Sequence, residues 1–209
     1  MTVVQTCALP IIPDWGFSCL VESDDQKILF DTGAKAEVLA GNMKKLGIDL
    51  FQIDAVFISH DHWDHTGGLA AVLEKNQVPV FVPESFADDS VMPGIIRIRE
   101  PLEIAKNIYS TGELKQIEQS LVIRLENDEV TVVAGCSHPG VEEILGAASV
   151  FGKVTTLVGG LHGFQDFELI DDLKRICPTH CTQYINEIAA RYPEKVIPGG
   201  AGKVIVLQR

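Results

Sequence analysis

The sequence predicts a layered α/β fold with mixed β-sheets, and three observations support that class. Short apolar segments separated by turn signals fill the first third of the chain, strand–helix alternation fills the last part, and reactive side chains follow the predicted strands. With 209 residues the chain can bury a sizeable core. No repeat, low-complexity tract or linker divides it, so we expect a single domain over residues 1–209.

The first 82 residues carry most of the expected antiparallel strands. The segments "FSCLVES" and "KILF" are separated by the turn-like "DDQ", and a helix that follows "FDTG" ends at Gly47. "IDAVFIS" reads as a buried strand that leads into a polar cluster. We expect strands at 2–9, 17–23, 27–30, 53–59 and 78–82, and helices at 34–46 and 67–76.

The remaining segments are expected to alternate between strands and helices. Residues 84–112 contain Pro93, Gly94 and Pro101, and we expect loops and edge strands there. "SLVIRLEN" and "EVTVVAG" flank the turn "ND" and predict a hairpin. Helices are expected near 141–150, 167–175 and 182–191, and strands at 154–160 and 176–178.

Composition argues against several classes of partner. The net charge of −12 is unfavourable for nucleic acid and for an anionic membrane surface, because both require basic patches. No apolar run approaches the roughly 20 residues that span a bilayer. The N-terminal segment lacks a basic residue before its apolar residues and contains two prolines, which is a poor signal peptide. We therefore expect a cytoplasmic protein, and the sequence indicates no oligomeric state.

All six histidines lie at predicted strand ends. Three fall in "SHDHWDHTGG", residues 59–68, and the others fall in "GCSHPG", "GGLHGF" and "PTHCT". Loops at strand ends are where α/β folds collect reactive groups. Neutral imidazole and carboxylate together suit a borderline metal such as zinc, iron or manganese.

The HxHxDH pattern predicts a two-ion site. His60 and His62 would hold one ion, while Asp64 and His65 point towards a second. Two neighbouring cations can share a water, lower its pKa and stabilise an oxyanion. The alternative is a solvated loop whose histidines make ordinary hydrogen bonds.

These motifs carry a family resemblance. "ILFDTG" followed by "ISHDHWDHTGGL" resembles the metallo-β-lactamase superfamily. "GCSHPGV", "GGLHGF", "PTHCT" and "GAGKVIVL" resemble its branch of 7,8-dihydropterin-6-methyl-4-(ribofuranosyl)aminobenzene-5'-phosphate synthases, the archaeal dihydropteroate-synthase-like group. The resemblance covers residues 16–207 and implies an αββα sandwich of two mixed sheets flanked by helices.

The resemblance also implies ligand roles. His60, His62 and His138 match the ligands of the first ion, and Asp64, His65 and His180 match those of the second. Asp31 matches an aspartate that supports the metal loop without binding the ion. An N-cap for the helix near residue 34 is its alternative role, and both roles could hold.

One position departs from the family pattern. Gly160 occupies the place of the aspartate that bridges the two ions in most members, so the second ion is in doubt. His162 is the substitute as ligand, general acid or phosphate contact, against the alternative of a structural histidine. Five cysteines without a CxxC pair predict neither a disulfide framework nor a zinc knuckle. Thiolate suits zinc, but we expect Cys136 and Cys181 to be packing residues.

The sequence therefore predicts a metal-dependent hydrolase with two divalent cations, zinc first and manganese or iron as alternatives. A metal-bound hydroxide, oriented by Asp64, would attack a small-molecule ester, thioester, lactone or phosphoester. The branch resemblance favours a phosphate- or pterin-bearing substrate. Two alternatives remain: a pterin-type transferase that releases pyrophosphate, and a non-catalytic metal- or ligand-binding module, which the loss of an aspartate at Gly160 would fit.

Overall fold

The computed structural model describes residues 2–6, 12–23, 26–87 and 94–207. It contains two compact units: unit 1 comprises Met1–Arg99 and Gly200–Arg209, and unit 2 comprises Glu100–Gly199. The single domain expected over residues 1–209 stays a prediction. Residues 7–9 of the first expected strand and residues 24–25 of the "DDQ" turn lie outside the described residues.

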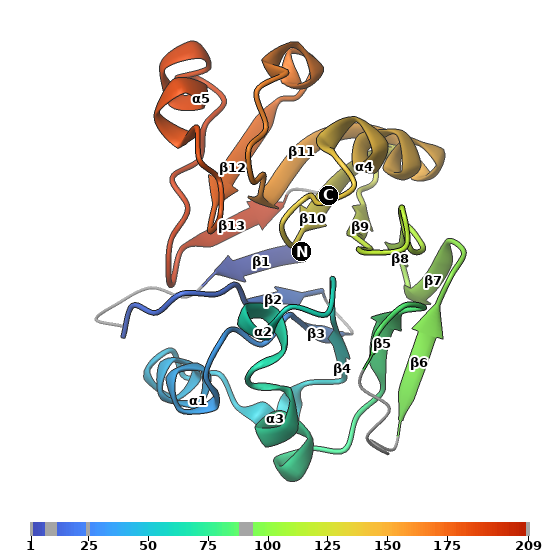
Figure 1. Cartoon of the computed structure of the whole chain (residues 1–209), viewed down its shortest axis with the longest axis vertical. Coiled ribbons are helices and arrows are strands. Elements are labelled where there is room, and N and C mark those ends of the chain that lie inside the picture. The colour runs from blue at the N-terminus through green and yellow to red at the C-terminus, as the bar shows by residue number, and fades with distance from the viewer. Residues whose placement is uncertain (1, 7–11, 24–25, 88–93, 208–209) are drawn as a thin grey trace. The chain divides into compact units, whose positions relative to one another are not determined.

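Unit 1 contains a mixed sheet with the strand order β13-β1-β2-β3-β4-β5-β6 (Figure 1). Its strands are β1 (Thr2–Thr6), β2 (Cys19–Glu22), β3 (Lys27–Phe30), β4 (Ala55–Phe57), β5 (Val80–Pro83), β6 (Ile95–Ile98) and β13 (Val204–Leu207). The pairs from β13 to β3 are antiparallel, and those from β3 to β6 are parallel. Because β3 and β4 are parallel neighbours, the residues that follow them share one edge of the sheet.

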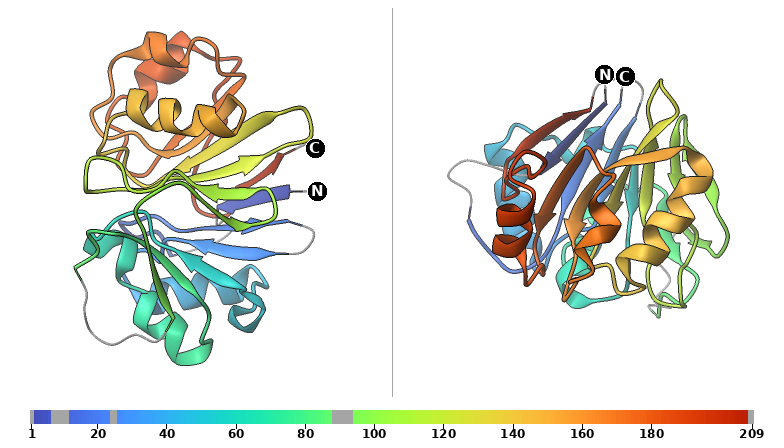
Figure 2. Two further views of the ribbon diagram at one scale, coloured as in Figure 1. Left: turned by 90° about the vertical axis from the view of Figure 1, so that its right-hand side faces the viewer. Right: turned by 90° about the horizontal axis from the view of Figure 1, so that it is seen from above.

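The helices of unit 1 pack on its sheet through apolar side chains. They are α1 (Ala36–Lys45), α2 (Trp63–Thr66) and α3 (Leu69–Lys75), with a 3₁₀ turn η1 (Leu50–Gln52). The shared core includes Leu39 and Met43 of α1, Leu69 and Val72 of α3, and Val56 and Val80 of the sheet. Each such buried side chain contributes about 1.5–3 kcal/mol to stability. Figure 2 shows the helices of unit 1 on one side of its strands.

Unit 2 contains a second mixed sheet with the strand order β12-β11-β10-β9-β8-β7. Its strands are β7 (Leu102–Ala105), β8 (Ile108–Ser110), β9 (Leu121–Arg124), β10 (Glu129–Ala134), β11 (Lys153–Gly160) and β12 (Arg175–Thr179). The antiparallel pair β9–β10 confirms the predicted hairpin. The pairs β10–β11 and β11–β12 are parallel, so the residues after these three strands meet at one edge.

The helices of unit 2 cover its sheet in the same way. They are α4 (Val141–Ala148) and α5 (Ile185–Arg191), with 3₁₀ turns η2 (Ser149–Phe151) and η3 (Phe167–Ile170). Ile144 of α4 and Ile188 of α5 belong to one core with Val132, Leu157 and Ile176 of the strands. Both sheets are therefore mixed and flanked by helices, as the sequence predicts.

The expected helix over 167–175 is wrong beyond its first turn. Only η3 forms, because the Lys174 N–H donates to the Thr155 carbonyl over 2.8 Å and β12 begins at Arg175. Because Lys174 and Arg175 bond to β11, they cannot continue a helix after η3. The helix expected at 182–191 starts at Ile185, since the Thr182 hydroxyl accepts a hydrogen bond from the Leu161 N–H over 3.0 Å.

No helix among the described residues is long and apolar enough to cross a membrane. Of the segment 84–112, where loops and edge strands are expected, residues 88–93 lie outside the described residues. In the described part, β6 and β7 lie at sheet edges, whereas β8 lies between β7 and β9.

Candidate metal centre

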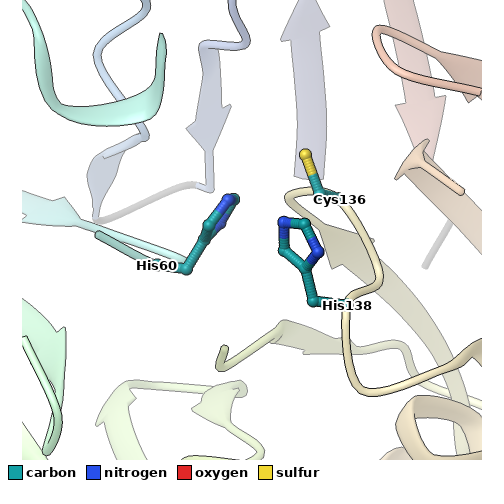
Figure 3. Close-up of side chains that lie close together, drawn as sticks. All are labelled: His60, Cys136 and His138. Carbon is teal, nitrogen blue, oxygen red and sulfur yellow. The ribbon is translucent and has the colours of Figure 1, made fainter. Parts of the chain in front are cut away.

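The HxHxDH loop of unit 1 follows β4, beside the end of β3. Asp31 is the first residue after β3, and His60 lies three residues after β4 ends. Figure 3 shows the His60 side chain. Alternate side chains of the loop take different directions: the Asp61 carboxylate accepts a hydrogen bond from the Ala87 N–H over 2.9 Å. The loop then enters α2, in which the His65 N–H donates to the His62 carbonyl over 2.9 Å.

Asp31 connects the two strand ends. Its Oδ1 accepts from the Ser59 N–H, and its Oδ2 accepts from the Ser59 hydroxyl, each over 2.7 Å. Oδ2 also lies 2.7 Å from His65 Nδ1. All three residues are fully buried. Asp31 therefore orients His65 and ties the loop to β3, and the alternative N-cap role is wrong because α1 begins at Ala36 without a side-chain cap.

The nitrogens of His60 and His62 converge. His60 Nδ1 lies 2.9 Å from the Ser59 hydroxyl, and His60 Nε2 lies 3.0 Å from His62 Nδ1. Two nitrogens bound to one tetrahedral zinc would be about 3.3 Å apart, from Zn–N bonds of about 2.0–2.1 Å. The pair therefore fits a shared cation with little movement.

Asp64 and His65 form the other half of this cluster. His65 Nε2 lies 3.9 Å from Asp64 Oδ2, which accepts a hydrogen bond from the Trp15 indole N–H over 2.8 Å. The imidazole rings of His60 and His65 lie 4.1 Å apart, centroid to centroid. Unit 1 thus brings together the five candidate residues predicted for it: Asp31, His60, His62, Asp64 and His65.

In unit 2 the remaining three histidines follow three parallel neighbours. His138 follows β10, His162 follows β11 and His180 follows β12. The rings of His138 and His162 lie 4.9 Å apart, centroid to centroid. The clustering predicted from strand ends is therefore present within this unit.

Glu118, which belongs to none of the sequence motifs, holds the loop of His138 in place. Glu118 Oε1 accepts from the N–H groups of Gly135, Cys136 and Ser137 over 3.0–3.1 Å, and its Oε2 accepts from the His138 N–H over 2.8 Å. Glu118 is fully buried. One carboxylate therefore satisfies four consecutive backbone donors and fixes the direction of the loop.

Two cysteines lie inside the unit 2 cluster. Cys136 Sγ, Cys181 Sγ and a ring nitrogen of His162 all lie within 4.8 Å of one another. Cys136 and His138 leave the same loop (Figure 3). A hydrogen bond with Cys136 lowers the pKa of Cys181 to about 6, and His162 acts in the same direction, whereas burial opposes it. The two thiols thus lie beside a candidate ligand, and the expectation that they are packing residues stays a prediction.

The packing around position 160 explains why a glycine stands there. A Cβ built at this position would lie 2.4 Å from the Gly135 carbonyl oxygen and 2.7 Å from Cys181 Sγ. Any side chain here would require the backbone of the His138 loop to move. The close packing of this part of unit 2 therefore excludes an aspartate at position 160.

Several residues in the candidate-ligand loops share an unusual backbone conformation. Asp31, Ser137, His162 and His180 have φ between 46° and 61°, the left-handed region that non-glycine residues rarely adopt. Each lies one to three residues beyond the end of one of the strands that lead to the candidate ligands. Such conformations tend to cluster at functional sites, where the surroundings hold them in place.

Trp15, Ser59 and Glu118 lie outside the residues that the sequence motifs identify. All three act through hydrogen bonds to candidate ligands or to their loops. Ser59 could have been found as the residue before His60, whereas Trp15 and Glu118 lie far from the motifs in the sequence.

Comparisons with known proteins cover most of the chain. A family model described as the metallo-beta-lactamase superfamily matches residues 14–161. The 7,8-dihydropterin-6-methyl-4-(beta-D-ribofuranosyl)-aminobenzene-5'-phosphate synthase of Methanocaldococcus jannaschii is 27% identical over 92% of this chain and 91% of its own length.

Two solved structures are similar over nearly their whole length. Tm1679, described as a metal-dependent hydrolase of the beta-lactamase superfamily, has a TM-score of 0.81 at 24% identity and covers 100% of both chains. A diphosphatase from the PhnP family has a TM-score of 0.64 at 14% identity and covers 98% of this chain and 97% of its own.

Proposed function

Because this chain belongs to the metallo-β-lactamase superfamily and has its fold, we propose that it is a metal-dependent hydrolase of a small-molecule ester, thioester, lactone or phosphoester. One observation carries the proposal. In unit 1 the ring nitrogens of His60 and His62 converge, and Asp64 lies beside His65. Ser59 holds the second ring nitrogen of His60, Asp31 holds that of His65, and the Trp15 indole N–H donates to Asp64. A solvated loop would not hold imidazoles in fixed orientations by buried partners.

The cofactors in this proposal are two divalent cations, zinc first and manganese or iron as alternatives. Imidazole and carboxylate donors accept all three metals, so the donor set leaves the choice open. The assignment of His60, His62 and His138 to one ion, and of Asp64, His65 and His180 to the other, follows the family resemblance and stays a prediction.

The cations would supply a nucleophile at neutral pH and stabilise the developing oxyanion. Asp64, held by the Trp15 indole N–H, would orient the attacking water and accept its proton. His162 is exposed and stands as the proton donor to the leaving group, as a phosphate contact, or as the ligand that replaces an aspartate at position 160.

Turnover by purified, metal-replete protein tests the proposal. We expect hydrolysis of at least one member of a panel of esters, thioesters, lactones and phosphodiesters, and loss of that activity in His62→Ala. Asp61→Asn is the matched control, because Asp61 lies in the same loop but bonds to the Ala87 N–H. Unchanged activity in His62→Ala would contradict the assignment.

A transferase is the second candidate, because the relative from Methanocaldococcus jannaschii is a synthase whose named product joins a dihydropterin to an aminobenzene ribofuranosyl phosphate. The same residues would then serve a pyrophosphate leaving group, with an aromatic partner as nucleophile in place of water. Pyrophosphate release that requires an added aromatic acceptor would favour this activity. Hydrolysis of the substrate in water, without any aromatic acceptor, would favour the hydrolase.

A non-catalytic metal- or ligand-binding module is the third candidate. Gly160, which stands where most superfamily members carry an aspartate, is the feature that favours it. Metal bound at full stoichiometry without turnover of any tested substrate would support this reading. The absence of a nucleic-acid partner stays a prediction that rests on the net charge of −12. A cytoplasmic location stays a prediction that rests on the N-terminal segment and on the lack of a long apolar run.

A further inference from the structure

We propose that Cys136, His162 and Cys181 form a thiolate-containing zinc site within unit 2. The three donor atoms lie within 4.8 Å of one another. None of the assignments above includes a thiolate ligand, so this site adds a different class of donor. The hydrolase proposal can fail while this site stands, because ligation is measured without turnover.

The position of the three residues follows from the sheet. Each lies just after one of the parallel neighbours β10, β11 and β12. Hydrogen bonds along these strands hold the strand ends in register, so the three loops start from fixed points. Glu118 accepts the Cys136 N–H over 3.1 Å and fixes the first loop further. A cluster supported in this way is preorganised for a ligand.

Gly160 makes room for the Cys181 thiol. A Cβ at this position would lie only 2.7 Å from Cys181 Sγ. The sulfur therefore occupies the space in which a side chain on residue 160 would begin. Cys181 Sγ also lies 3.9 Å from the Cys136 carbonyl oxygen, against the backbone of the first loop.

The donor set suits zinc in geometry and in chemical type. Bonds of about 2.3 Å to sulfur and about 2.0 Å to nitrogen place tetrahedral ligands about 3.3–3.8 Å apart. The observed separations, within 4.8 Å, need an approach of about 1 Å, which small rotations of the side chains can supply. Thiolates select zinc over magnesium and calcium. Three protein ligands leave one coordination position for water.

Cobalt substitution tests thiolate ligation directly. The metal-free full-length chain would be titrated with Co²⁺ under a phosphine reductant while the ultraviolet sulfur-to-cobalt charge-transfer band is recorded. We expect a band that saturates in the wild type and falls by about half in Cys136→Ala and in Cys181→Ala, because each removes one of two thiolates. The double variant should lose the band.

Cys177→Ala is the matched control. Cys177 is a buried cysteine of β12 in the same unit, and it lies outside the three-residue group. We expect this variant to keep the band. Cobalt held only by nitrogen and oxygen gives no sulfur band. Because Cys136 Sγ also lies within 4.8 Å of donor atoms of His138 and of His180, the loss of intensity in Cys181→Ala is the result that assigns the band to this site. Absence of the band in the wild type, or its persistence in the double variant, would overturn the proposal.

A second measurement needs no variant. Cys181 is partly exposed, so iodoacetamide should alkylate it in the metal-free wild type, and zinc should slow that labelling several-fold. Magnesium should leave the rate unchanged, because it prefers oxygen ligands. Equal labelling with and without zinc would overturn the site. A Cys136–Cys181 disulfide that forms in air, with no cobalt band after reduction, would instead identify a redox pair and also overturn it.

Discussion

At the scale of single residues, the candidate ligands are held in place by side chains that are not themselves among the candidate ligands. His65 is oriented by Asp31, His60 by Ser59, and the loop of His138 by Glu118. The ligands in HxHxDH can be read from the sequence because their spacing is regular. The residues that support these ligands cannot be read from the sequence in this way. Glu118, for example, accepts hydrogen bonds from residues that lie 17–20 positions further along the chain.

Asp31→Asn should lower metal affinity roughly 10–100-fold, because the neutral amide weakens the polarisation of His65. Asparagine tolerates the φ of 53° at this position, so the fold should survive. Zinc binding would be measured by competition with a chromophoric chelator. Asp128→Asn is the control, since Asp128 has a φ of 57° in the exposed turn between β9 and β10. Equal affinity in both variants would contradict the role of Asp31.

Glu118→Gln should destabilise the protein by about 2–4 kcal/mol, because an amide nitrogen would face buried N–H groups that now donate to a carboxylate. The loss would be measured by urea unfolding. Glu126→Gln, at an exposed position of the turn between β9 and β10, is the control and should leave stability unchanged. If Glu118→Gln were as stable as the wild type, the four backbone hydrogen bonds would not matter for the loop.

At the scale of elements, parallel strands decide where the candidate residues lie. The carboxyl ends of β10, β11 and β12 bring His138, His162 and His180 to one sheet edge. The sequence predicts these strands from apolar runs that end in polar clusters. It does not predict that the helix expected over 167–175 ends early. That end depends on β11, to which the Lys174 N–H donates and with which β12 pairs from Arg175 onward.

Gly159→Ala should destabilise unit 2 by about 2–5 kcal/mol, since it combines an unfavourable φ with overpacking. Gly159 has a φ of 131°, and an added Cβ would lie 1.9 Å from the Ala134 carbonyl oxygen on β10. Thermal unfolding would measure the change. Gly146→Ala in α4 is the control: it meets nothing within 4 Å, and we expect it to raise stability by about 0.5–1 kcal/mol.

At the scale of the whole molecule, metal binding should be coupled to stability. The chain carries a net charge of −12, and bound divalent cations would offset part of it. A ligand that binds the folded state only, at about 100 times its dissociation constant, stabilises that state by about 2.7 kcal/mol. Zinc should therefore act on the melting temperature of the chain as well as on its activity.

We expect zinc to raise the melting temperature by roughly 5–10 °C for a chain of this size. A chelator should reverse the shift, and His62→Ala should reduce it, because that variant removes an exposed candidate ligand without opening the core. Scanning calorimetry at several zinc concentrations would measure the shift. A melting temperature independent of zinc would contradict metal binding by the folded chain.

The sequence by itself determined the fold class, the family and the positions of the histidines, because apolar periodicity and the HxHxDH spacing are local properties of the chain. The tertiary structure alone decided that Glu118 holds the His138 loop, that Gly160 has no room for a side chain, and that Cys136 and Cys181 lie beside His162. These facts depend on which strands become neighbours. Unlike the β9–β10 hairpin, pairing between strands far apart in the sequence is decided by burial and register across the sheet, and no local pattern records it.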